Sequence, residues 1–192
     1  MNLPNKLTLM RIILTPVFMA VLYWGFPGAD YAALAIFIIA SLTDLLDGKI
    51  ARKYHLVTDF GKFADPLADK ILVTAAMLWF VEVGRMPAWA LLVVLLREFA
   101  VSGLRMIASD KGRVIAAGWS GKVKTAATMV CLIVMLLLGP QIAWAASDPL
   151  TAMPAGWLRW IDPVCVWVIV LTTLYSGVEY FMKNADILAE AK

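Results

Sequence analysis

Six long apolar stretches constrain the fold of this chain more than any other feature of its sequence. A membrane-spanning helix needs about 20 predominantly apolar residues. The stretches cover residues 7–24, 31–51, 66–83, 87–107, 121–138 and 160–181. They hold more than half of the chain, and 62% of its 192 residues are hydrophobic, against about 45–50% in soluble domains. The sequence therefore predicts an all-α integral membrane protein with six transmembrane helices in one bundle, forming a single domain over residues 1–192.

Positive charges are distributed unevenly between the two ends of this predicted bundle. Of the 17 lysines and arginines, all but Arg85, Arg97 and Arg159 lie at or near one end. Because such residues concentrate on the cytoplasmic side of membrane proteins, both termini are expected to face the cytoplasm from the cell (inner or plasma) membrane. Tryptophans gather at the opposite end, as an interfacial belt would: Trp24, Trp89, Trp144, Trp157 and Trp160. The net charge of +3 gives no indication of nucleic-acid binding.

Four aspartates lie where the second stretch ends and the third begins. They are Asp44, Asp47, Asp65 and Asp69. A carboxylate at membrane depth is costly and needs a partner or a water-filled cavity. In a helix, the i,i+3 and i,i+4 spacings place each pair on one face. Because the connection over residues 53–60 is short, the two helices are expected to be antiparallel neighbours whose four carboxylates can converge near the cytoplasmic interface.

Converging carboxylates need cations close by. Without them, repulsion would force some of the acids to be neutral. Mg²⁺ and similar hard divalent cations prefer oxygen ligands and leave positions open for substrate phosphates, and two such ions can clamp a diphosphate. The face that carries Asp44 and Asp47 also carries Gly48 and Ala51, which lack bulk and let a nucleotide approach the helix backbone. Arg52 follows on that face, and its planar guanidinium group is suited to binding phosphate.

The segment from Asp44 to Asp69 resembles the signature of the CDP-alcohol phosphotransferase family. In letters it is D-x2-D-G-x2-A-R-x8-G-x3-D-x3-D, and every defined position is present. The resemblance covers nearly the whole chain, because the family also has six membrane helices and cytoplasmic termini. Its members bind a CDP-activated lipid or alcohol and displace CMP with an acceptor hydroxyl. The resemblance further implies a homodimer.

The resemblance also implies roles for particular residues. Asp44, Asp47, Asp65 and Asp69 match the family's ligands for Mg²⁺ or Mn²⁺, with two ions expected, and Asp69 also matches the general base. The residues that match CDP-binding positions are Asn5, Thr8, Gly48, Arg52 and Thr58. For Asn5 and Thr8 there is an alternative, since short polar residues before a helix are commonly N-caps.

A second cationic cluster is expected on the cytoplasmic side: Arg105, Lys111, Arg113, Lys122 and Lys124. Lysines and amides at a helix N-terminus favour an anion, although the general excess of positive charge on this side is an alternative explanation. The runs 97–105, 114–117 and 121–125 are similar to family members that use CDP-diacylglycerol and glycerol 3-phosphate. This implies phosphatidylglycerophosphate and CMP as products, in phospholipid biosynthesis, with the acceptor phosphate at Arg105, Lys122 and Lys124 and with Arg113 behind them. Serine, inositol phosphate and phosphatidylglycerol are alternative acceptors within the family.

Arg97 and Glu98 lie near the middle of the fourth stretch. Adjacent side chains leave a helix about 100° apart and need not pair with each other. Arg97 is expected to face the bundle interior and to meet a carboxylate or a substrate phosphate.

Two other classes of protein fit the four aspartates less well. A Mg²⁺ transporter would also have a buried acidic cluster, but transporter sites lie near the midplane, whereas these acids lie at one membrane face. A purely structural membrane protein leaves the aspartates unexplained.

Overall fold

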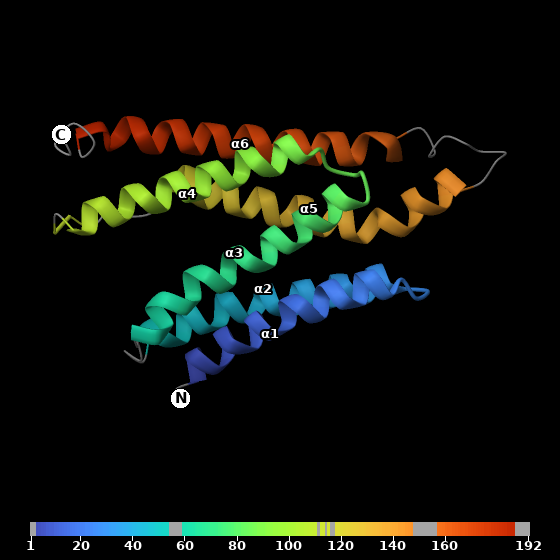
Figure 1. Ribbon diagram of the computed structural model, residues 1–192, viewed down its shortest axis with the longest axis horizontal. Coiled ribbons are helices and arrows are strands. Elements are labelled where there is room, and N and C mark those ends of the chain that lie inside the picture. The colour runs from blue at the N-terminus through green and yellow to red at the C-terminus, as the bar shows by residue number, and fades with distance from the viewer. Residues whose placement is uncertain are drawn as a thin grey trace.

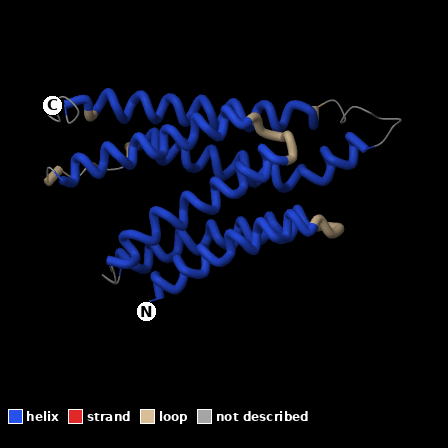
Figure 2. The backbone as a smooth tube through the Cα atoms, viewed as in Figure 1, coloured by secondary structure: helices blue, strands red, loops and turns tan. Residues whose placement is uncertain are grey.

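The computed structural model describes residues 3–53, 59–110, 112–113, 115, 118–147 and 157–186, with side chains described for 5–43, 67–68, 70–110, 112–113, 115, 118–139 and 157–186. Within these residues the chain forms six α-helices, one short 3₁₀ helix and no strand (Figure 2). The elements are α1 (Leu3–Trp24), α2 (Ala29–Lys53), α3 (Asp59–Glu82), α4 (Ala88–Asp110), α5 (Trp119–Ser147), η1 (Leu158–Trp160) and α6 (Ile161–Lys183). The predicted all-α class is confirmed.

The helices run alternately up and down along the long axis of the molecule (Figure 1). Short connections enforce this direction change between α1 and α2 and between α3 and α4. Gly25 and Gly84 begin the two reversals with φ of 63° and 73°, a conformation that other residues rarely adopt. The start of α1 and the end of α6 therefore lie at the same end of the bundle (Figure 1), called here the terminal end.

Two groups of three helices build the bundle. In the first group α1 packs against both α2 and α3, and in the second α6 packs against α4 and α5. Contacts of α2 with α5 and of α3 with α4 join the groups. The rings of Phe18 and Phe37 pack with their centroids 6.0 Å apart. The largest fully buried apolar side chains come from five helices: Phe18, Phe37, Met77, Phe80, Leu132, Met135, Leu136 and Ile169.

Three stretches of the described helices are long and apolar enough to cross a membrane: Asn5–Trp24, Trp119–Gly139 and Leu158–Lys183. Residues Ala29–Thr43 of α2 form a shorter apolar helix. Four of the tryptophans predicted to form a belt are exposed at the end opposite the termini: Trp24, Trp89, Trp157 and Trp160. Their role as a belt at the membrane interface stays a prediction. The side chain of Trp144 lies outside those described.

Two predicted helix boundaries are wrong. Helix α3 begins at Asp59, before the predicted start at 66, and α5 continues through Gly139 and Pro140 to Ser147, beyond the predicted end at 138. Pro140 has no backbone N–H, which normally ends or kinks a helix. One turn earlier, Arg85 Nη2 donates a hydrogen bond to the carbonyl oxygen of Met135 at 2.9 Å. A side chain from the α3–α4 connection thus bonds to α5 next to Leu136, whose carbonyl oxygen is the one that Pro140 leaves without its usual donor.

The same arginine ties three elements together at the end opposite the termini. Its Nε and Nη2 donate to the two carboxylate oxygens of Asp162 at 2.8 and 2.7 Å, a two-point pairing that fixes both groups. Gly139 lies directly beside it, because a Cβ added there would sit 2.8 Å from Arg85 Nη1. The absence of a side chain at Gly139 lets the guanidinium reach Asp162.

We therefore expect Gly139→Ala to destabilise the protein by about 1–3 kcal/mol, the usual cost of crowding a packed site. The added methyl group would displace the guanidinium from Asp162. The check is the melting temperature of the purified protein in detergent. The matched control is Gly103→Ala in α4, where an added Cβ meets nothing within 4 Å. Equal melting temperatures for the two variants would contradict this account of Gly139.

Candidate active site

A polar stripe on α1 leads from the terminal end into the bundle. Asn5, Thr8, Arg11 and Thr15 recur at helical spacing, and their exposed fractions are 8%, 0%, 1% and 4%. Since α1 packs against α2 and α3, this stripe lies against the helices that carry the aspartates. Asn5 and Thr8 lie inside α1, which begins at Leu3, so the N-cap alternative is wrong. Their proposed contacts with the nucleotide stay predictions.

The four aspartates lie on two helix segments at the terminal end. Asp44 and Asp47 belong to the second half of α2, and Asp65 and Asp69 to the first half of α3. These halves lie beside each other in the bundle (Figure 1). Both helices are continuous through these residues, so each pair stays on one helix face. The aspartate side chains are outside those described, and their convergence stays a prediction.

This donor set fits a divalent cation. Carboxylate oxygens are the ligands that Mg²⁺ and Mn²⁺ prefer, and here they come from two neighbouring helix segments. Among the side chains that the structure describes, no other group of three or more histidines, cysteines or acids could hold a metal. The assignment of Asp44, Asp47, Asp65 and Asp69 as metal ligands therefore stays the prediction to test.

The signature also predicts nucleotide contacts on and after α2. Gly48 and Arg52 lie within α2, but the Arg52 side chain is outside those described. Thr58 lies outside the described residues altogether. Their roles stay predictions.

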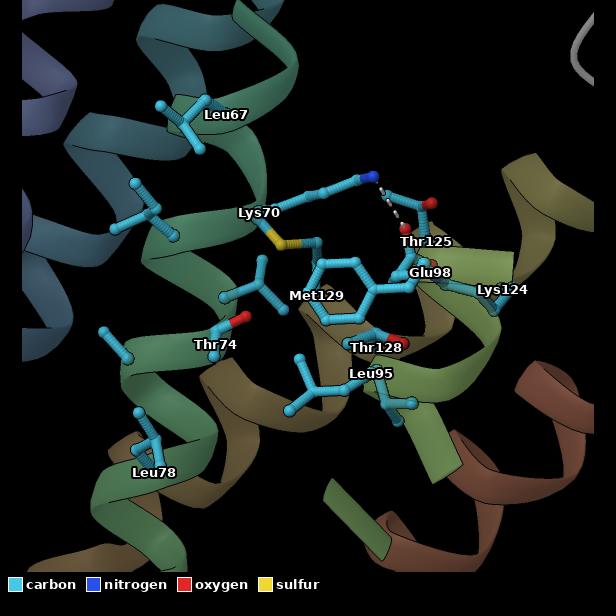
Figure 3. A pocket seen from close by; sticks show the side chains of 15 residues that line it. Leu67, Lys70, Thr74, Leu78, Leu95, Glu98, Lys124, Thr125, Thr128 and Met129 are labelled. Atoms are coloured by element: carbon cyan, nitrogen blue, oxygen red, sulfur yellow. Dashed lines mark hydrogen bonds and ion pairs between the residues drawn. The ribbon is translucent and has the colours of Figure 1, made fainter. Parts of the chain in front are cut away.

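A groove of about 410 Å³ runs between α3, α4 and α5. Most of its lining is apolar, and it opens on the surface, because Leu78 and Phe99 on its rim are 49% and 70% exposed. The charged residues of its lining gather toward the terminal end: Lys70, Glu98 and Lys124. Figure 3 shows Lys70 reaching from α3 toward Glu98, while Thr74 and Leu78 line the groove farther along the same helix. The groove thus has a charged end toward the terminal end of the bundle and is apolar along the rest of its length.

One carboxylate in this groove meets three cations. Lys124 Nζ and Arg97 Nη1 donate to Glu98 Oε1 at 2.5 and 2.9 Å. Lys70 Nζ lies 3.9 Å from Glu98 Oε2 and donates to Ser102 Oγ at 2.5 Å. These residues come from α3, α4 and α5. We call Lys70, Arg97, Glu98 and Lys124 the Glu98 cluster.

Arg97 is held from a fourth helix. Its Nη2 donates to Ser176 Oγ of α6 at 2.6 Å. Its stem passes Gly177, where an added Cβ would lie 3.2 Å from Arg97 Cγ. The prediction that Arg97 faces the interior and meets a carboxylate is confirmed. That carboxylate is its neighbour Glu98, a pairing that helical geometry alone did not require.

The four residues predicted to bind the acceptor phosphate have different surroundings. Arg105 Nε donates to Tyr180 Oη at 3.0 Å and the guanidinium lies over the same ring, while Arg113 pairs with Asp186 at 2.7 Å. Lys122 is exposed, and Lys124 is buried against Glu98. The described contacts therefore bring only Lys124 into the Glu98 cluster. Whether all four bind one phosphate stays a prediction.

Sequence reasoning missed two residues that the structure places in or near the site. Lys70 was counted only as a cytoplasmic positive charge, although it follows Asp69 directly. Arg11 was counted in the same way, yet it is almost completely buried. The available signal was position, because Arg11 recurs at helical spacing with the predicted site residue Thr8, and Lys70 is the sequence neighbour of the predicted site residue Asp69.

Comparison with known proteins identifies the family. The sequence profile described as CDP-alcohol phosphatidyltransferase matches residues 1–175. The chain is 43% identical to the CDP-diacylglycerol–glycerol-3-phosphate 3-phosphatidyltransferase of Bacillus subtilis (strain 168), over 97% of both chains. It is 35% identical to the Escherichia coli (strain K12) protein of that name, over 97% of both chains. A Rickettsia bellii protein of that name is 34% identical over 94% of this chain and 93% of its own. The chain belongs to the CDP-alcohol phosphatidyltransferase family.

Proposed function

We propose that this protein transfers the phosphatidyl group of CDP-diacylglycerol to glycerol 3-phosphate, giving phosphatidylglycerophosphate and CMP. The structural observation that carries the proposal is the groove between α3, α4 and α5, with an apolar length and a charged end formed by Lys70, Glu98 and Lys124. Such a shape suits an acyl chain joined to a phosphate-bearing head group. The relatives match this chain over nearly its whole length, and their names support glycerol 3-phosphate as the acceptor.

The aspartates supply the electrostatics of the reaction. Two metal ions, either Mg²⁺ or Mn²⁺, would be held by Asp44, Asp47, Asp65 and Asp69. When bound, the metal would neutralise the diphosphate and stabilise the oxygen that leaves with CMP. Asp69 would also accept the proton of the acceptor hydroxyl.

The bond changes follow from this arrangement. The hydroxyl oxygen of glycerol 3-phosphate attacks the phosphorus that bears diacylglycerol, and its proton passes to Asp69. The bond from that phosphorus to the bridging oxygen breaks, and CMP leaves with the electron pair. Asn5, Thr8, Gly48, Arg52 and Thr58 would hold the CDP portion while this occurs.

The proposed setting is the cell (inner or plasma) membrane, crossed six times. With both termini at one end of the bundle (Figure 1), the aspartates and both termini would share the cytoplasmic side. There a lipid head group and the water-soluble glycerol 3-phosphate can meet. A homodimer is the proposed assembly, by analogy with the family.

The acceptor can be tested with purified protein, CDP-diacylglycerol and Mg²⁺ or Mn²⁺. Glycerol 3-phosphate, serine, inositol phosphate and phosphatidylglycerol are offered separately, and the lipid products are identified by mass spectrometry. Phosphatidylglycerophosphate should form with glycerol 3-phosphate, and the other acceptors should be used poorly. Turnover with serine but none with glycerol 3-phosphate would refute the proposed acceptor.

Binding of the phosphate group of glycerol 3-phosphate is expected to depend on Arg105 and Lys122. Since a hydrogen bond to a charged group contributes about 1.5–3 kcal/mol, Arg105→Ala or Lys122→Ala should raise the KM for glycerol 3-phosphate about tenfold or more. The KM for CDP-diacylglycerol should change much less. The control is Lys183→Ala, an exposed lysine at the same end that pairs with Glu179. Equal increases in both KM values would contradict a phosphate pocket at these residues.

A further inference from the structure

The Glu98 cluster has more positive than negative charge. Its single carboxylate faces three cations, whose side chains are 37% exposed at Lys70, 12% at Arg97 and 10% at Lys124. The charges of Arg97 and Lys124, which are held largely away from water, need compensation. Within the cluster itself the excess is two positive charges. A phosphate monoester carries about −1.5 to −2 at neutral pH and would match that excess.

The three cations are not equally free to meet such a group. Arg97 is fixed by Glu98, by Ser176 and by the close approach of Gly177. Lys124 makes the shortest contact with Glu98. Lys70 makes the longest, at 3.9 Å, and is the most exposed of the three. The ammonium of Lys70 can therefore turn toward a ligand in the groove without breaking the rest of the cluster.

We propose that Glu98 is a positioning residue, which holds Lys70 and Lys124 at the charged end of the groove so that they receive a phosphate group of a substrate. This inference rests on the proposed function and assigns roles to Lys70, Arg97 and Glu98 within it. Arg97 anchors the carboxylate from the side of α6, and Ser102 orients Lys70. The carboxylate of Glu98 lies between the two lysines and keeps their ammonium groups close together.

Two sources of phosphate share this chemistry, namely glycerol 3-phosphate and the diphosphate of CDP-diacylglycerol. The exposure of the Lys70 side chain, 37%, favours the acceptor, because a water-soluble molecule can reach this end of the groove. Lys124 is also one of the predicted acceptor residues. The experiment separates the two sources by measuring each substrate independently.

The decisive variants are Glu98→Gln, Glu98→Asp and Lys70→Ala. For each, the dissociation constant of glycerol 3-phosphate is measured by titration calorimetry on the detergent-solubilised protein, and KM and kcat are measured for both substrates. Glu98→Gln should raise the dissociation constant and the KM for glycerol 3-phosphate about tenfold, with a smaller change in kcat. Lys70→Ala should act in the same direction, and Glu98→Asp should recover part of the loss, because it keeps the charge with a shorter reach.

The direction of the Glu98→Gln effect is diagnostic. If Glu98 acted only as a negative charge, its removal would strengthen phosphate binding, since opposite charges attract more when a competing anion is lost. A positioning role predicts weaker binding instead. The matched controls are Glu179→Gln and Lys183→Ala, an acid–lysine pair on α6 at the same end, which should leave both substrates unaffected.

Each outcome has a definite meaning. A larger KM increase for CDP-diacylglycerol than for glycerol 3-phosphate would support the phosphate role and assign it to the lipid. Tighter binding in Glu98→Gln, or unchanged binding of both substrates in Lys70→Ala at wild-type melting temperature, would overturn the inference. Failure of the wild-type protein to use glycerol 3-phosphate would instead refute the proposed function, so the two failures are distinguishable.

Discussion

Replacing Asp69 by asparagine is expected to lower the rate of CMP release by about a thousandfold or more. Asparagine has nearly the same size, but it cannot accept the proton of the acceptor hydroxyl and is a weaker ligand for a divalent cation. Loss of a general base alone commonly costs about 10²–10⁴-fold in rate, and the loss of a metal ligand adds to this. The measurement is CMP release by purified protein with CDP-diacylglycerol and glycerol 3-phosphate.

The fold should survive this substitution, because no apolar contact is removed. The melting temperature and elution volume of Asp69→Asn should therefore match those of the wild-type protein. Asp110→Asn is the matched control, since Asp110 is an exposed acid at the last residue of α4, at the same end of the bundle. Its activity should equal that of wild type. Substantial CMP release by Asp69→Asn would refute an essential role for Asp69.

Removal of divalent metal is expected to have an equally large effect. Chelation should abolish turnover, and added Mg²⁺ or Mn²⁺ should restore it, because four carboxylates without cations repel one another and the diphosphate. Binding of Mn²⁺, followed by electron paramagnetic resonance, gives a reading independent of activity. Asp44→Asn and Asp65→Asn should each weaken Mn²⁺ binding about tenfold or more, whereas Asp110→Asn should not. Unimpaired turnover in chelator would contradict the metal site.

The helices were predictable because each is an apolar run bounded by glycine, proline or charge. The predicted end of α5 at residue 138 is wrong because glycine followed by proline, here Gly139-Pro140, commonly ends a helix. The structure continues the helix through both residues, and Arg85, a residue distant in sequence, packs beside Gly139. The start of α3 was placed too late for a related reason, since its first turns carry the polar signature residues and lack an apolar pattern.

The candidate site was predictable where residues are close in sequence. Asp44 and Asp47, like Asp65 and Asp69, form short motifs on single helices, and their spacing alone indicates a shared face. The Glu98 cluster was not predictable in this way. It joins Lys70, Glu98 and Lys124 from three helices, with Ser176 from a fourth, and no local pattern relates positions so far apart. Only the packing of α3, α4, α5 and α6 reveals that they meet.

The most direct test of the proposed reaction follows the phosphorus atom. CDP-diacylglycerol is prepared with radioactive phosphorus in the phosphate attached to diacylglycerol and incubated with the purified protein, metal and glycerol 3-phosphate. The account predicts that the label appears in phosphatidylglycerophosphate, with unlabelled CMP released in equal amount. Labelled phosphatidic acid together with a cytidine-containing glycerol derivative would show attack at the other phosphorus and would contradict the proposed transfer, as would the absence of any labelled product that requires glycerol 3-phosphate.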